Sequence, residues 1–192
     1  MSEPIRSFTT AVPYWRPRIT PLDIEEASDE QLEAMKVTTS NTNIGEFTLV
    51  LALDPETLLH FTPLLNGIMS GQGGLSRQET ELGAVSASVV NRSIYCAAAH
   101  SDRYNQLTKD DAVMDSILSS GEAADISLRQ KALLLFSSKL SKYPSEATKA
   151  DVERLSDNGL NMDEVLDLVF AASLFNWVNR LSHVLGDPLP QR

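Results

Sequence analysis

The sequence predicts an all-α protein with a single helical domain. From residue 28 onward, nearly every segment repeats its apolar residues with the period of a helix. Residues that cap helices stand at the breaks in this pattern, and the alternation typical of strands is almost absent. We therefore expect an extended N-terminal arm, residues 1–27, followed by one helical bundle, residues 28–192.

The N-terminal arm is rich in proline, which fixes one backbone angle and lacks the amide proton that a helix needs. The aromatic residues Tyr14 and Trp15 look exposed in such a segment. An arm of this kind must lie on another surface, and both the body of the same chain and a neighbouring subunit remain open. The prolines of this stretch are Pro4, Pro13, Pro17 and Pro21.

Three capping signals mark where the first helices begin. Ser28 stands before an acidic first turn, and Asp54 precedes a proline, a residue favoured at the start of a helix. The run from Ser76 to Glu79 is a capping box that starts a third helix after the glycine-rich loop 70–74. We interpret these glycines as a helix end and not as a phosphate loop, because no lysine follows at the required position.

The helices that follow differ in how much of their surface is apolar. The helix from residue 76 to about 91 has small and branched apolar residues on nearly all sides, so we expect it to be the central helix. The helix 162–185 carries an apolar surface wider than one stripe, and we expect it to pack against both the core and a second subunit. The other expected helices span residues 95–106, 109–119, 126–142 and 151–158.

The composition argues against several classes of protein. The formal net charge is -10 and the 16 basic residues are scattered, so neither nucleic acid nor an anionic membrane surface is an expected partner. A single cysteine cannot form an internal disulfide. The chain begins without the long apolar run of a signal peptide, and no later stretch approaches the roughly 18 apolar residues of a membrane span. We therefore expect a cytoplasmic protein.

The candidate site contains the single cysteine, Cys96, with His100 four residues later and Glu81 one helix earlier. Positions i and i+4 are neighbours on a helix, with Cβ atoms roughly 6 Å apart, so the imidazole lies near the sulfur. The thiolate is the nucleophilic form of cysteine, and a nearby base or a place in the first turn of a helix lowers the pKa of the thiol. If the two helices fold back on each other, Glu81 can orient His100 so that it takes the thiol proton.

Each of these three residues also has a structural interpretation. Cys96, beside three alanines, is typical of a small buried residue in a tight helix contact. His100 is typical of a packed or surface histidine. Glu81 lies near the start of a helix, where a solvated acidic side chain is favoured by the helix dipole. The occurrence of all three together favours a thiol site.

These residues and the C-terminal tail resemble a known family. The motif of alkylhydroperoxidase D-like proteins, within the carboxymuconolactone decarboxylase superfamily, is a glutamate, a Cys-x-x-Cys pair and a histidine four residues after the second cysteine. The tail from Phe175 to Leu181 is similar to that of the branch of uncharacterised peroxidase-related proteins, so the resemblance covers residues from about 29 to 189. The residues that carry the motif are Glu81, Ser93, Tyr95, Cys96 and His100.

The resemblance implies an all-helical fold that assembles as dimers, trimers or hexamers and reduces small hydroperoxides without metal or haem, so no cofactor is expected. In the family, the second cysteine attacks the peroxide and the first resolves the sulfenic acid as a disulfide. By position, Cys96 is the attacking thiol, His100 and Glu81 form its activating relay, and Ser93 stands where the resolving cysteine should be. Tyr95 occupies the place of a further histidine, and its phenol is a poor base near neutral pH.

The missing second thiol determines how such an enzyme would turn over. An external thiol or a redox protein must regenerate Cys96, because no other cysteine is present in the chain. The leading hypothesis is therefore a thiol-dependent hydroperoxide reductase with antioxidant, peroxiredoxin-type activity that uses one cysteine.

Three alternatives remain open. The first is lyase chemistry like that of carboxymuconolactone decarboxylase, in which acid–base residues act and Cys96 is dispensable. The second is a non-catalytic helical oligomer, which the absence of a resolving cysteine favours. The third is a metal site, for which His60 and His183 offer ligand types without ligand spacing. We interpret these two histidines as packing or dipole partners.

Overall fold

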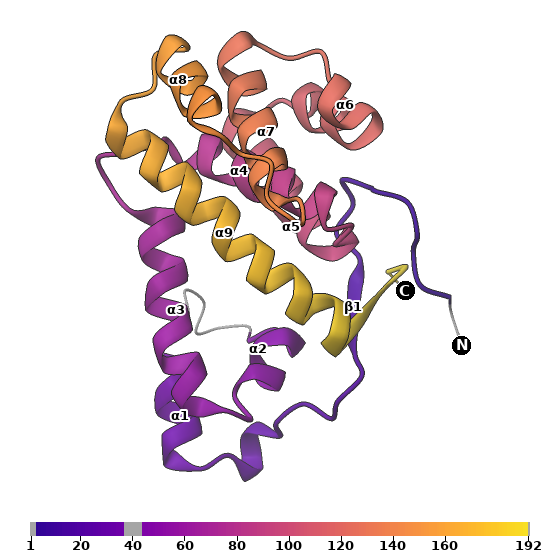
Figure 1. Cartoon of the computed structure of the whole chain (residues 1–192). Helices are drawn as coiled ribbons and strands as arrows, with labels where there is room; N and C mark the ends of the chain where they lie inside the picture. The colour runs from indigo at the N-terminus through magenta and orange to yellow at the C-terminus, as the bar shows by residue number, and fades with distance from the viewer. Residues whose placement is uncertain (1–2, 37–43, 192) are drawn as a thin grey trace.

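A computed structural model describes residues 3–36 and 44–191, and its architecture is helical as predicted (Figure 1). Residues 1–2 of the predicted arm and residues 37–43 and 192 of the predicted bundle lie outside the described residues. In chain order the elements are β1 (Tyr14–Pro17), a 3-10 turn (Ile24–Glu26), α1 (Asp29–Lys36), α2 (Glu46–Leu51), α3 (Pro55–Ser70), α4 (Arg77–Val90), α5 (Ile94–Thr108), α6 (Ala112–Ser120), a second 3-10 turn (Gly121–Ala123), α7 (Leu128–Ser141), α8 (Lys149–Asp157), α9 (Met162–Leu185) and β2 (Gly186–Leu189).

The capping signals predicted the helix starts correctly. Asp54 accepts a hydrogen bond from a backbone N–H in the first turn of α3, and Ser76 and Glu79 form the capping box of α4. α9 has the predicted bounds, and Asn161 and Glu164 form a capping box at its start. The sequence did not predict α2, because six residues are too few to show a helical period.

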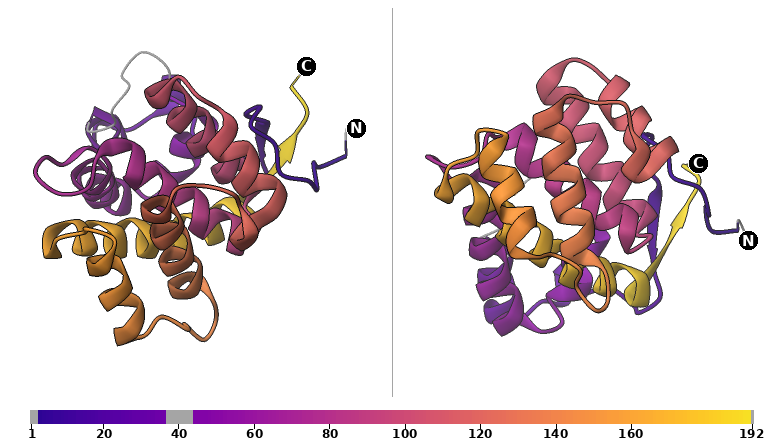
Figure 2. Two further views of the ribbon diagram at one scale, coloured as in Figure 1. Left: turned by 90° about the horizontal axis from the view of Figure 1, so that it is seen from above. Right: turned by 45° about the horizontal axis from the view of Figure 1, so that its top comes forward.

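α4 is the central helix, as predicted, and lies between α5, α7 and α9 (Figure 2). Every residue from Thr80 to Ser88 is buried. Two apolar clusters form around α4. One joins α4 to α6, α7 and α8, and the other joins it to α1, α3, α9 and the start of α5, where it includes Cys96. The candidate thiol therefore belongs to the core.

The described part of the N-terminal arm lies on the body of its own chain. β1 pairs antiparallel with β2, with Trp15 opposite Pro188. Trp15 is 4% exposed and its ring N–H donates to the carbonyl of Ser182, so the expectation that it is exposed was wrong, whereas Tyr14 is 40% exposed. A Cβ on Gly186 would lie 2.2 Å from the Trp15 ring, so this pairing requires glycine there.

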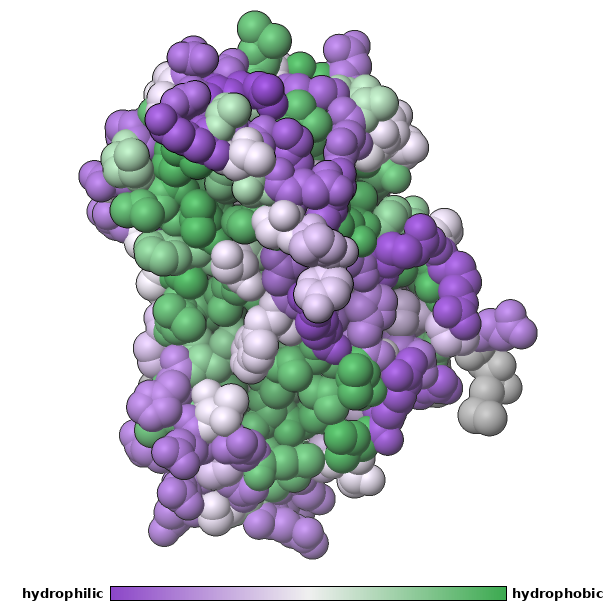
Figure 3. Space-filling model, viewed as in Figure 1, coloured by the Kyte–Doolittle hydropathy of each residue, from purple (hydrophilic) through white to green (hydrophobic). Residues whose placement is uncertain are grey.

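An apolar groove runs between α3 and α9, on the face shown in Figure 3, where hydrophobic residues gather. Leu64, Phe170 and Trp177 are 55%, 52% and 41% exposed along it. Among the described residues, no helix is both long enough and apolar enough to span a bilayer. The second subunit expected on α9 stays a prediction, and light scattering of the purified chain tests it.

We predict that Asp151→Asn destabilises the contact between α7 and α8. Asp151 is 4% exposed, accepts a hydrogen bond from Lys139 at 2.6 Å and is held by Thr148, so its pKa falls from 3.8 to about 2. A carboxyl group whose pKa is lowered by folding stabilises the protein above its unfolded pKa, and that contribution disappears as the pH falls through the folded pKa. The variant should lose about 2 kcal/mol of unfolding free energy near neutral pH.

Urea unfolding of both proteins at several pH values measures this difference. The loss should be full at neutral pH and should shrink between pH 3.8 and about 2, following the lowered pKa of Asp151. A loss that stays constant over that interval would show that the charge of Asp151 has no part in it.

Candidate active site

A sharp turn between α4 and α5 creates the site. α4 ends at Val90, Arg92 takes a left-handed backbone conformation with a φ of 55°, and Ser93 is the N-cap residue of α5. The two helices then pack against each other over much of their length. This arrangement brings Glu81 of α4 into contact with His100 of α5, as the candidate relay requires.

Glu81 is the centre of an ion-pair network. Its side chain has 0% exposure, and one carboxylate oxygen lies 2.5 Å from Nδ1 of His100. The other oxygen accepts a hydrogen bond from Nε of Arg77 at 2.7 Å and forms an ion pair with Nη2 of the same residue at 2.6 Å. Arg77 also donates to the hydroxyl of Ser70, which ties α4 to the end of α3. Glu81 is therefore a buried, paired side chain and not a solvated one.

The network keeps Glu81 ionised and determines which nitrogen of His100 carries a proton. Burial raises the pKa of Glu81, but the hydrogen bond and charge of His100, together with the charge of Arg77, outweigh burial and hold the pKa below its ordinary value. A carboxylate only accepts hydrogen bonds, so Nδ1 of His100 donates to it. In the neutral imidazole, Nε2 is then free to accept a proton.

Cys96 lies in the first turn of α5, and its side chain lines the same cavity as His100. The residue is 5% exposed. Burial raises the pKa of the thiol, and hydrogen bonds with the hydroxyls of Ser93 and Ser182 oppose this rise without cancelling it. The sequence led us to expect a lowered pKa for Cys96, and the structure raises it instead. Because the pKa is raised, the resting group at neutral pH is the thiol.

The shared cavity has a volume of about 260 Å³ and a mostly apolar wall. The ring of Phe175 meets the ring of His100 edge-on, with centroids 4.3 Å apart, and so restrains the imidazole. The polar groups of the cavity, besides Cys96 and His100, are Thr48, Thr62, Tyr95 and Ser182, and its large apolar side chains are Phe47, Leu58, Phe61, Leu65, Phe175 and Val178.

Ser93 and Tyr95 flank the thiol but supply no second sulfur. Ser93 is 2% exposed and hydrogen bonds to Cys96 from the position where the family motif has its first cysteine. Tyr95 is half-buried in the cavity wall. Burial, followed by the charge of the neighbouring Cys96, raises the pKa of Tyr95, so the phenol stays protonated and can donate a hydrogen bond to a substrate oxygen.

Two residues of the site were not predicted from the sequence. Arg77 lies four residues before Glu81 on α4, and this spacing is a recognisable signal of an ion pair on a helix. Ser182 comes from α9 and reaches Cys96 of α5 across the core. No local pattern connects these two segments of the sequence, so Ser182 could only be found from the structure.

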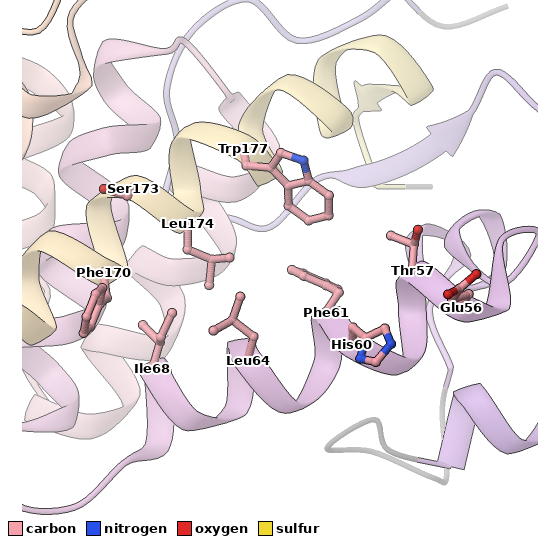
Figure 4. Close-up of a pocket in the computed structure, with 10 residues that line it drawn as sticks. All are labelled: Glu56, Thr57, His60, Phe61, Leu64, Ile68, Phe170, Ser173, Leu174 and Trp177. Carbon is pink, nitrogen blue, oxygen red and sulfur yellow. The ribbon is translucent and has the colours of Figure 1, made fainter.

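The other two histidines lie apart from Glu81. His60 is exposed in the groove between α3 and α9, where Phe61 contacts Trp177 with ring centroids 5.0 Å apart (Figure 4). His183 pairs with the carbonyl of Asn91 at 2.8 Å. Within residues 3–36 and 44–191, no group of three or more His, Cys, Asp or Glu side chains is arranged to hold a metal ion.

Comparison with known proteins finds a family match over part of the chain. Residues 55–136 match the family model of the carboxymuconolactone decarboxylase family. This range contains Glu81, Cys96 and His100. No curated protein matches the chain.

Solved structures match over nearly the whole chain. An uncharacterized peroxidase-related protein from Ralstonia eutropha JMP134, described as an alkylhydroperoxidase AhpD core, is 26% identical over 91% of this chain and 92% of its own, with a TM-score of 0.77. An uncharacterized peroxidase-related protein from Silicibacter sp. TM1040 is 25% identical over 92% of both chains, with a TM-score of 0.74. The debrominase Bmp8 shares the fold alone, at 15% identity over 87% of this chain and 89% of its own, with a TM-score of 0.72.

The family match spans the segment from α3 into α7, and the two peroxidase-related structures match 91% and 92% of the chain. The chain is therefore similar to alkylhydroperoxidase D-like, peroxidase-related proteins over nearly its whole length, and its residues 55–136 match the carboxymuconolactone decarboxylase family.

Proposed function

We propose that this protein is a one-cysteine hydroperoxide reductase that depends on an external thiol. The observation that carries the proposal is the ionised, buried Glu81, which orients His100 at the wall of the cavity that also contains the single cysteine. The peroxidase-related names of two similar structures support the same class of chemistry. An antioxidant role follows from this activity.

The first step oxidises Cys96 by two electrons. Its sulfur attacks the outer oxygen of the hydroperoxide, the S–O bond forms, the O–O bond breaks, and the alkoxide leaves as an alcohol after taking the thiol proton. His100 carries this proton through Nε2. In the described residues no hydrogen bond joins Cys96 to His100, so the proton passes through a water molecule or through the bound hydroperoxide. Because the resting thiol is protonated, His100 acts during the attack instead of maintaining a thiolate.

Two external thiols then return Cys96 to its starting state. The first condenses with the sulfenic acid to form a mixed disulfide and releases water. The second attacks this disulfide, forms a disulfide with the first external thiol and releases the Cys96 thiol. Each hydroperoxide therefore consumes two thiols. Ser93 cannot replace the first of them, because a hydroxyl forms no disulfide.

The experiment that tests this proposal follows a small organic hydroperoxide with and without dithiothreitol. We expect loss of about one equivalent of hydroperoxide without the reductant and continued loss with it, with one oxidised dithiothreitol formed per hydroperoxide. A folded protein that consumes no hydroperoxide under either condition would overturn the proposal.

Lyase chemistry remains a second candidate because of one feature of the site. The Glu81–His100 pair can transfer protons without any part played by Cys96. The matching family model also bears the name of a lactone decarboxylase. This candidate predicts that a carboxylated lactone loses carbon dioxide at the same rate in the wild-type protein and in Cys96→Ser. The reductase predicts no such reaction.

We predict that Ser93→Cys converts the site into a two-cysteine site. Residues three apart at the start of a helix have Cα atoms roughly 5.5 Å apart, within the range that a disulfide spans. After one equivalent of hydroperoxide, the variant should lose both of its thiols as an internal disulfide. Thiol titration and the mass of the intact protein measure this result.

Ser101→Cys is the matched control for this prediction, because Ser101 is also buried on α5 but lies eight residues after Ser93 along the chain. It should keep its new thiol while Cys96 is oxidised. Two free thiols in Ser93→Cys after treatment with hydroperoxide would contradict the attacking role of Cys96.

A further inference from the structure

A second cavity, which we call the basic pocket, adjoins the Cys96 cavity. It has a volume of about 330 Å³ and lies between the N-terminal segment, the start of α5 and the junction of α9 with β2. Figure 1 shows these segments together at the side where the two chain ends lie. Three arginines in its lining carry positive charge, and three further residues lie on its side toward Cys96. These residues are Arg6, Arg18 and Arg92, and Ser93, Tyr95 and Ser182.

The basic pocket is positively charged within a chain whose net charge is -10. Its lining includes one carboxylate, Asp187, which already pairs with Arg18 at 2.6 Å and with Arg16 at 3.4 Å. Arg6 and Arg92 are exposed and take part in no ion pair in the described part of the chain. Two guanidinium groups are therefore available to an anionic ligand, and guanidinium is the side-chain group best suited to carboxylates and sulfonates.

The basic pocket and the thiol are separated by a thin polar wall. Tyr95 and Ser182 line both cavities. Ser93 lines the basic pocket, and its hydroxyl, like that of Ser182, hydrogen bonds to Cys96. A ligand in the basic pocket therefore lies one layer of side chains away from the sulfur of Cys96, whereas a hydroperoxide approaches from the apolar cavity.

We propose that the basic pocket binds the reductant, a small thiol that carries a carboxylate or sulfonate, and presents it to oxidised Cys96. This inference rests on the proposed function for the reaction that it serves. The anionic group pairs with Arg6 and Arg92 while the thiol passes between the side chains of Ser93 and Ser182 to reach the sulfur of Cys96. That thiol and the Cys96 sulfenic acid form a mixed disulfide and water, and a second molecule of the same thiol completes the reduction.

The test compares two thiols of nearly equal size that differ in charge, 2-mercaptoethanesulfonate and the neutral 2-mercaptoethanol. Each is added to protein oxidised beforehand with one equivalent of hydroperoxide, and the rate at which the Cys96 sulfenic acid disappears is measured. We expect the anionic thiol to react about tenfold faster at low salt, and the preference to fall as salt screens the arginines. Equal rates for the two thiols would overturn the proposal.

The variant Arg6→Gln/Arg92→Asn removes both available charges, and asparagine tolerates the left-handed backbone at position 92. We expect it to lose the preference for the anionic thiol and to keep its rate with 2-mercaptoethanol. Arg103→Gln, an exposed arginine further along α5, is the matched control and should behave as the wild-type protein. A preference that survives in the double variant would place the anion elsewhere.

A binding measurement separates this proposal from the proposed function. S-methylglutathione carries the carboxylates of a natural small thiol but cannot reduce a sulfenic acid, and calorimetry measures its binding to the resting protein. Binding that is lost in Arg6→Gln/Arg92→Asn supports the pocket even if no hydroperoxide ever oxidises Cys96. If S-methylglutathione does not bind, or binds equally well to the double variant, the proposal that the basic pocket binds an anionic thiol is overturned, even if the peroxidase reaction is confirmed.

Discussion

Cys96→Ser is expected to abolish hydroperoxide reduction, with a loss of at least about a thousandfold, because it removes the nucleophile itself. Serine is close to cysteine in size, and the hydroxyls of Ser93 and Ser182 can hydrogen bond to its side chain. The unfolding free energy should therefore change by less than about 1.5 kcal/mol. Hydroperoxide consumption with dithiothreitol and urea unfolding measure the two effects separately.

Ser101→Ala is the matched control for the loss of Cys96. Ser101 is buried on the same helix, and its hydroxyl has no hydrogen-bond partner in the described residues, so its removal should leave turnover unchanged. Hydroperoxide reduction that persists in Cys96→Ser would exclude Cys96 as the nucleophile. Loss of turnover in both variants would point to damage to α5 instead of loss of a nucleophile.

Glu81→Gln is expected to slow hydroperoxide reduction by about a hundredfold to ten-thousandfold, the usual contribution of a positioned acid–base group. The amide leaves Nδ1 of His100 without a carboxylate partner and no longer balances the charge of Arg77. Breaking such a buried ionic contact should also cost about 3 kcal/mol of unfolding free energy at neutral pH. The rate of reaction and urea unfolding report these two effects.

The pH dependence of this loss has a defined sign. Because folding lowers the pKa of Glu81, its charge stabilises the folded protein above the unfolded pKa, and this contribution is lost as the pH falls through the folded pKa. The difference in stability between Glu81→Gln and the wild-type protein should therefore shrink in acid. A difference that is as large in acid as at neutral pH would show that shape, and not charge, explains it.

Glu79→Gln is the matched control for Glu81→Gln. Glu79 lies on the same helix and pairs with Arg129 at 2.6 Å, but it does not contact His100. Its variant should lose stability and keep the rate of hydroperoxide reduction. If the two variants lose the same fraction of activity, the effect of Glu81 is only structural.

The helices could be predicted from the sequence because their signals are local. The capping boxes at Ser76 and Asn161 mark the starts of α4 and α9 within a few residues of sequence. The β1–β2 pair could not be predicted, because Pro17 and Pro188 mask the strand pattern and the pairing joins the two ends of the chain. For the same reason the burial of Trp15 was missed.

The site was only partly predictable. The spacing of Cys96 and His100 on one helix is local, whereas the contact between His100 and Glu81 depends on how α5 folds back after Arg92. The pKa of Cys96 was expected in the wrong direction, because the first turn of a helix favours a thiolate but burial among α3, α5 and α9 opposes it more strongly. Burial of this kind is a property of tertiary packing and has no local signal.

The most direct test of the central claim is to trap the sulfenic acid at Cys96. The protein is mixed with one equivalent of a small organic hydroperoxide and a reagent that captures sulfenic acids, and peptide mass spectrometry locates the adduct. Our account predicts a rapid adduct at Cys96 in the wild-type protein and a much slower one in Glu81→Gln. An unmodified Cys96 thiol in folded wild-type protein, with the hydroperoxide still present, would contradict it.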